Sequence, residues 1–130
     1  MGWNIALIQN TVDVPEEARI AVAKKIIKNS DKFYDDHEHA SGVDAMNMVF
    51  YGGKLEFDAD DMEHMDYVTG SDEICAALAA AGATGRLTFG SLEGNNRGTF
   101  WGVEFASGHY RRLRATTADI NWNIGTSIPA

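Results

Sequence analysis

The sequence predicts a single α+β domain in which an antiparallel sheet carries two main helices on one face. Three observations lead to this fold class. Segments with alternating apolar residues occur at both ends of the chain, two segments between them have the 3.6-residue period of amphipathic helices, and glycine-containing turns separate the strands. The chain has 130 residues, two prolines and no Pro- or Ser-rich linker, so residues 1–130 are expected to form one domain.

The N-terminal part is expected to contain the first strand and the first helix. Residues 2–9 alternate between apolar and polar side chains, which is typical of a half-buried strand. Pro15 and the two glutamates after it mark the start of an amphipathic helix over about residues 15–29. Residues 30–43 have no clear period and are predicted to form a polar loop.

The middle of the chain predicts a hairpin and the second main helix. Two apolar runs flank Gly52 and Gly53, and paired glycines accept the positive φ angles of tight hairpin turns. A short helix is expected after Asp58. Thr69 or Ser71 then caps the second main helix, which Gly82 ends.

The C-terminal part predicts a three-stranded meander. Its strands lie around residues 87–89, 101–105 and 109–117, and Ser107-Gly108 makes the second turn. Residues 117–130 show no period and are expected to form a partly ordered tail. The resulting order is β-α-β-β-α-β-β-β, whose first six elements match the ferredoxin-like order, with a related sheet as the alternative. Seven residues are expected in the core: Trp3, Val22, Ile26, Leu78, Phe89, Trp101 and Val103.

The charge is negative overall and uneven along the chain. The net charge is −8, with sixteen acids and six bases in residues 1–83 but three acids and five bases in residues 84–130. An acidic surface repels phosphate backbones, so a nucleic-acid partner is not expected. The uneven distribution favours electrostatic pairing with a protein partner or between copies in a homo-oligomer.

The lack of membrane-span and export signals predicts a cytoplasmic protein. No run approaches the ~18 apolar residues of a membrane span, so no membrane association is expected. The N-terminus lacks the pattern of a signal peptide. Cys75 is the only cysteine, which leaves no intrachain disulfide, and its apolar neighbours predict a buried side chain.

The window from Glu56 to Glu73 holds eight acids and no base. A solvated surface is one interpretation. The other is a phosphate-like surface that docks into the basic groove of a nucleic-acid-handling protein. On that interpretation the partner-binding residues are Glu56, Asp58, Asp60, Asp61, Glu63 and Asp66.

A D-D-x-E-H pentad occurs twice, at residues 35–39 and 60–64. Carboxylates beside imidazoles suit a divalent metal ion, and the candidate ligands are His37, His39 and His64. No established ligand spacing such as HExxH is present. The competing interpretation is that both pentads are solvated acidic stretches, in which case no cofactor is expected.

A basic and aromatic surface for single-stranded RNA could form from residues of the C-terminal part: Arg97, Arg111, Arg112, Arg114, Phe100, Trp101 and Tyr110. The RNP signature of such sheets is missing. Because Arg112 and Arg114 alternate with Leu113, we interpret these two instead as the solvated face of an edge strand, where charges prevent aggregation.

In its small size, its acidity, its lack of catalytic motifs and its uneven charge, the chain is similar to inhibitors carried by phages and other mobile elements, including anti-CRISPR and DNA-mimic proteins. The resemblance implies a non-enzymatic, acidic protein-binding inhibitor that occludes a nucleic-acid-handling partner with a basic surface. The alternative is a metal-dependent enzyme or metal-binding protein that uses the two pentads.

Overall fold

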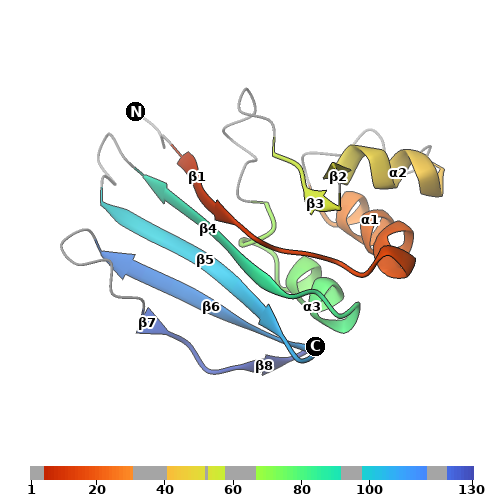
Figure 1. Ribbon diagram of the computed structural model, residues 1–130. Helices are drawn as coiled ribbons and strands as arrows, with labels where there is room; N and C mark the ends of the chain where they lie inside the picture. Colours follow the sequence, from red (N-terminus) through yellow and green to blue (C-terminus); the bar gives the residue numbers. More distant parts are fainter. Residues whose placement is uncertain (1–4, 31–40, 52, 58–66, 92–97, 117–122) are drawn as a thin grey trace.

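The structure is a computed structural model that describes residues 5–30, 41–51, 53–57, 67–91, 98–116 and 123–130 (Figure 1). An antiparallel sheet forms one layer, with its main strands in the order β1-β4-β5-β6-β7. The last short strand, β8, also pairs with β6. The strands are β1 (Ile5–Asn10), β4 (Gly85–Ser91), β5 (Thr99–Ala106), β6 (His109–Thr116), β7 (Asn123–Ile124) and β8 (Ile128–Pro129).

The helices lie together on one side of the sheet (Figure 1). Helix α3 packs against β5 and β6, α1 packs against α3, and α2 packs against α1. A separate two-stranded hairpin, β2 with β3, connects α2 to the rest of the chain. The bounds are η1 (Glu16–Ala18), α1 (Arg19–Lys28), α2 (Gly42–Val49), β2 (Phe50–Tyr51), β3 (Lys54–Leu55) and α3 (Asp72–Ala80).

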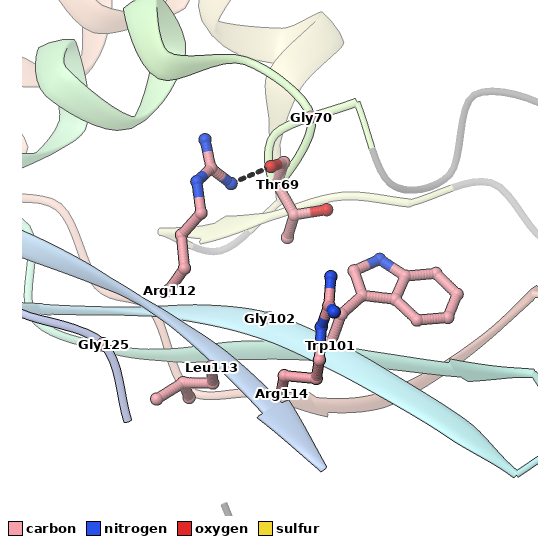
Figure 2. Close-up of a pocket in the computed structure, with 8 residues that line it drawn as sticks. All are labelled: Thr69, Gly70, Trp101, Gly102, Arg112, Leu113, Arg114 and Gly125. Carbon is pink, nitrogen blue, oxygen red and sulfur yellow. Dashed lines mark hydrogen bonds between the residues drawn. The ribbon is translucent and has the colours of Figure 1, made fainter. Parts of the chain in front are cut away.

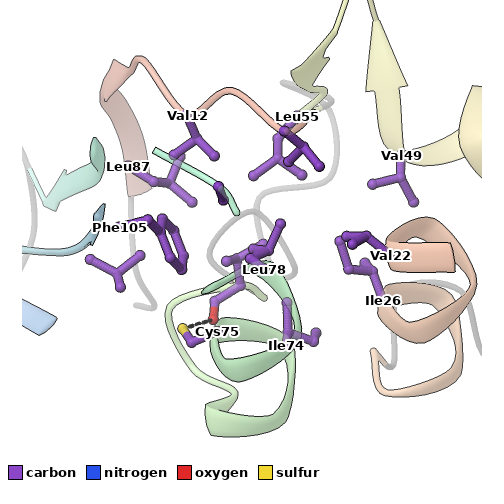
Figure 3. Close-up of a cluster of buried hydrophobic side chains, with 14 of the residues drawn as sticks. Val12, Val22, Ile26, Val49, Leu55, Ile74, Cys75, Leu78, Leu87 and Phe105 are labelled. Atoms are coloured by element: carbon purple, nitrogen blue, oxygen red, sulfur yellow. Dashed lines mark hydrogen bonds between the residues drawn. The ribbon is translucent and has the colours of Figure 1, made fainter. Parts of the chain in front are cut away.

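The core lies between the sheet and the helices because each element has one apolar face. Leu87 of β4 pairs with Val103 of β5, so both side chains point to the helix side, and both are fully buried. Figure 3 shows Ile26 of α1 and Leu78 of α3 in the same cluster. Each such side chain contributes about 1.5–3 kcal/mol on leaving water.

The predicted fold class is confirmed: the protein is α+β, with helices packed on an antiparallel sheet. Both main helices and the three-stranded meander are also confirmed. The ferredoxin-like order is not, because the β2-β3 hairpin pairs only with itself among the described residues and β1 lies beside β4. The sheet is therefore a meander extended by the N-terminal strand.

Helix α2 was not predicted, because the apolar run before Gly52 was interpreted as a strand. The Ser41 hydroxyl accepts a hydrogen bond from the backbone N–H of Asp44 at 3.1 Å and so caps the helix. Ala45 and Val49, one turn apart, are fully buried. Burial with a helical period therefore decides this segment, and only two residues remain for the strand.

The remaining fold predictions have mixed outcomes. Five of the seven expected core residues are buried, whereas Trp101 is half-buried against the core and Trp3 lies outside the described residues. The short helix expected after Asp58 also lies outside them. In the expected tail, β7 and β8 pair with β6, so the described part of the tail extends the sheet. No helix in the described ranges is both long and apolar enough to cross a membrane.

Candidate functional site

Most of the residues predicted to form a site lie outside the described residues. Of the six predicted contact acids, Glu56 is described, and it is exposed. The others are Asp58, Asp60, Asp61, Glu63 and Asp66, and the proposed metal ligands His37, His39 and His64 are outside as well. In the described ranges no three His, Cys, Asp or Glu side chains gather closely enough to hold a metal ion. The acidic-surface and metal hypotheses both stay predictions.

The two residues that flank the acid-rich segment 58–66 meet on the core. The ring centroids of Phe57 and Tyr67 are 5.6 Å apart, and Phe57 also makes an edge-on contact with Phe89 of β4 at 5.4 Å. Burial, together with the charge of Glu56, raises the pKa of the Tyr67 phenol. The residues on either side of segment 58–66 therefore lie together on the core, and the exposed Glu56 is next to Phe57 in the sequence.

The acid-rich window ends in the first turn of α3. The Ser71 hydroxyl accepts a hydrogen bond from the Ile74 N–H at 3.2 Å, so Ser71, one of the two predicted candidates, caps the helix. Asp72 and Glu73 follow and are exposed, at a helix end where negative charge is favourable. Asp72 and Glu73 therefore stabilise the N-terminal end of α3 and also add negative charge to the surface.

Arg112 of β6 ties this helix end to the sheet. Its guanidinium donates to the Asp72 carboxylate at 2.6 Å and to the backbone carbonyl of Thr69. The Tyr110 hydroxyl, two residues earlier on β6, donates to the same carboxylate oxygen of Asp72 at 3.3 Å. The hydrogen bond and the charge of Arg112 hold the pKa of Asp72 below its usual range.

A hollow of about 370 Å³ opens between this loop and the sheet. Trp101 and Arg114 are register partners on β5 and β6, and Figure 2 shows both side chains projecting from the sheet toward Thr69. Arg112 lies on the other side of the same hollow (Figure 2). The full lining is Thr69, Gly70, Trp101, Gly102, Arg112, Leu113, Arg114 and Gly125.

The two arginines of this hollow differ in their partners. Arg112 is held by Asp72 and Thr69, whereas Arg114 is exposed and makes no ion pair with any acid that the structure describes. The ring of Trp101 is held in place because it stacks on Phe89 of β4, with ring centroids 6.3 Å apart and ring planes at 29°. The hollow thus combines one engaged guanidinium, one available guanidinium and an anchored indole.

The prediction that Arg112 and Arg114 form the solvated face of an edge strand is wrong about the edge and about Arg112, which pairs with Asp72 of α3, whereas Arg114 is exposed as predicted. Arg112 and Arg114 point to the helix side of the sheet, and β7 and β8 pair along the outer side of β6. Arg111 alone points to the opposite face, where it pairs with Glu104 at 3.3 Å. The tight turn at Ser107-Gly108 was the signal that could have revealed this, because it fixes which β5 residues face which β6 residues.

Cys75 is buried on α3, as predicted. Its thiol donates to the backbone carbonyl of Val68 at 3.2 Å, and Figure 3 shows it within the apolar cluster. Burial raises the pKa of the thiol to about 12. The side chain is therefore a protonated packing group at neutral pH.

Comparison of the chain with protein-family models, curated proteins and solved structures gives no match. The described residues themselves define the class: an α+β protein with an antiparallel sheet, an arginine–tryptophan hollow and acids at the start of α3.

Proposed function

We propose that this protein is a non-enzymatic inhibitor that acts in the cytoplasm by covering a basic surface of a nucleic-acid-handling partner. It would be an anti-defence protein of a phage or mobile element, of the anti-CRISPR or DNA-mimic type. The observation that supports this most is the contact of Phe57 with Tyr67, whose ring centroids are 5.6 Å apart. These two residues flank the acid-rich segment 58–66, and the contact holds them together on the core.

The contact between Phe57 and Tyr67 matters for binding. Association costs free energy when a segment must be ordered, so a segment whose two flanking residues already contact each other loses less conformational entropy on binding than a free chain does. Phe57 also contacts the fully buried Phe89 of β4, which connects the pair of Phe57 and Tyr67 to the sheet. Five of the eight acids of the window lie between Phe57 and Tyr67 in the sequence.

Three acids of this window are described, and two of them have no ion pair with a described base. Asp72 is paired with Arg112, but the exposed Glu56 and Glu73 make no ion pair with a base in the described part of the chain. Uncompensated like charges repel each other, and a basic partner relieves that repulsion. The bases of residues 84–130 lie on β4 to β6 or between these strands, so the two signs of charge are separated along the chain.

The test is affinity capture from the native host at low salt, with the triple variant Asp60→Lys, Asp61→Lys, Glu63→Lys beside the wild type. We expect the variant to melt at a similar temperature but to lose the captured partner. The wild-type interaction should weaken with salt, because the attraction is screened over about 8–10 Å at physiological ionic strength.

A matched control reverses three exposed bases elsewhere: Lys24→Glu, Lys25→Glu and Lys28→Glu on α1. This variant should still capture the partner, because it changes charge without touching the acids. Capture that survives the reversal of the three acids would contradict the proposal. The arginine-bearing strand β6 would then be the next candidate for the contact surface.

A further inference from the structure

We infer that the hollow between Trp101, Arg114 and the Thr69–Gly70 loop binds a small ligand that carries an anionic oxygen group next to a flat ring. Nucleoside monophosphates and aromatic carboxylates share this chemistry. The inference goes beyond the proposed inhibitor function, since it concerns a separate site for a small molecule and does not use the acids of the window from Glu56 to Glu73 as contacts.

The anionic end is assigned to the arginines. Arg114 has no acid partner among the described residues, so its guanidinium is available for a carboxylate or a phosphate. Arg112 uses two of its five N–H donors on Asp72 and Thr69, which leaves further donors on the same side chain. Asp72 cancels one of the two positive charges, so the hollow keeps one net positive charge, which favours an anionic group.

The flat end is assigned to Trp101. Its indole is half-buried, stacked on Phe89 and placed opposite Arg114 by the strand register. An anchored indole offers a stacking surface to a planar ring at little cost in side-chain entropy. Stacking of a base on an aromatic side chain is worth about 1–3 kcal/mol in nucleic-acid-binding proteins. The ring and the anion would thus be recognised by register partners on neighbouring strands.

The size of the hollow limits the ligand. A volume of about 370 Å³ is at the lower end of the range of about 300–1,000 Å³ for small-molecule sites. It has room for one ring system with one anionic group. The hydrogen bonds of Arg112 to Asp72 and Thr69 fix the loop above the sheet, so the walls are preorganised.

The experiment is an NMR titration of the full chain with adenosine 5′-monophosphate and indole-3-carboxylate. Adenosine alone tests the ring, and inorganic phosphate alone tests the anion. We expect shifts in the lining residues, and binding of at least one two-part probe about tenfold tighter than either half, since a charge-assisted hydrogen bond contributes about 1.5–3 kcal/mol. A preference for the nucleotide or for the carboxylate identifies the source of the ligand.

The discriminating pair of variants is Arg114→Gln and Arg111→Gln. Both remove one charge from β6, but Arg111 points to the opposite face, and its partner Glu104 keeps Arg86 at 2.7 Å. Arg114→Gln should weaken binding about tenfold and Arg111→Gln by no more than about twofold. Equal effects of the two variants, equal binding of phosphate and the nucleotide, or no shifts with either two-part probe would overturn the inference.

Discussion

Arg112 of β6 and Asp72 of α3 form a hydrogen-bonded ion pair of 2.6 Å between residues that are 40 positions apart in the sequence. The pair fixes the start of α3 over the sheet and closes one side of the hollow that Trp101 and Arg114 share. It also sets the protonation behaviour of Asp72, which makes the contact measurable in solution.

Asp72→Asn tests this pair through the pH dependence of stability. Because Arg112 lowers the pKa of Asp72, the folded state binds fewer protons there than the unfolded state does. The stabilisation is therefore present above the unfolded pKa of about 3.9 and is lost as the pH falls through the lowered folded pKa. We expect the variant to be less stable than the wild type to urea at neutral pH, with a difference that shrinks below about pH 4.

Glu73→Gln is the control for this prediction, because it removes an acid from the same turn of α3 that makes no ion pair with a described base. Its stability difference from the wild type should be smaller at neutral pH. A difference for Asp72→Asn that stays constant from neutral to strongly acidic pH would show that the charge of Asp72 does not contribute.

Gly85→Ala should be strongly destabilising. Gly85 begins β4 with φ +105°, and an added Cβ would lie 2.2 Å from the backbone carbonyl oxygen of Thr11. The neighbouring backbone is held, since the Thr11 N–H donates to the Arg86 carbonyl. We expect a loss of about 3 kcal/mol or more in the free energy of unfolding, because strained backbone and a main-chain clash add.

Gly108→Ala is the matched comparison, because Gly108 also has positive φ, at +77°, but nothing lies within 4 Å of an added Cβ. Only the conformational cost of about 1–2 kcal/mol applies there. Urea unfolding of both variants measures the difference. Equal losses would mean that the backbone at Thr11 moves away from an added Cβ at Gly85 without cost.

The elements that the sequence predicted well are those with a local cause. Ser71 and Gly82 bound α3, and Ser107-Gly108, with φ of +53° and +77°, joins two alternating strands. Helix α2 was missed because the apolar run near its end suits a buried strand as well as a helix. The Ser41 cap with Asp44 at its third position was the local signal against that interpretation.

The hollow could not be predicted from local pattern, because its walls come from distant parts of the chain. The Thr69–Gly70 loop and β6 are joined by Arg112, whose partner Asp72 is 40 residues away. Alternation along β6 predicts which arginines share a face, but not what covers that face. The acids and histidines show the opposite case: their pattern is plain in the sequence, and the predictions on them await a direct test.

Cys75 should react slowly with thiol reagents in the native state. Its thiol is buried, hydrogen-bonded to Val68 and has its pKa raised to about 12, so little thiolate is present or accessible. Labelling then requires opening of α3 and should accelerate in urea.

Leu78→Ala removes a fully buried side chain from the same helix at a cost of about 2–5 kcal/mol and should raise the labelling rate under native conditions. Fast labelling of the native wild type would contradict the burial of Cys75.

The two D-D-x-E-H pentads give the metal alternative its own measurable consequence. A ligand that binds only the folded state stabilises it by about 2.7 kcal/mol at 100 times its dissociation constant. A metal site in the pentads would therefore make the melting temperature rise with Zn²⁺ or Mn²⁺, and His39→Ala or His64→Ala would abolish the rise.

The inhibitor proposal uses the acids of the second pentad as part of a contact surface for a protein, so under it we expect the melting temperature to stay unchanged by millimolar metal. His109→Ala is the control, because His109 is exposed at the start of β6 and belongs to neither pentad. A metal-dependent rise that persists in His109→Ala but disappears in both pentad variants would replace the inhibitor proposal with the metal alternative. A rise that disappears only in His109→Ala would assign the ion to β6 and leave the pentads as surface charge, because a ligand must be lost for the stabilisation to be lost.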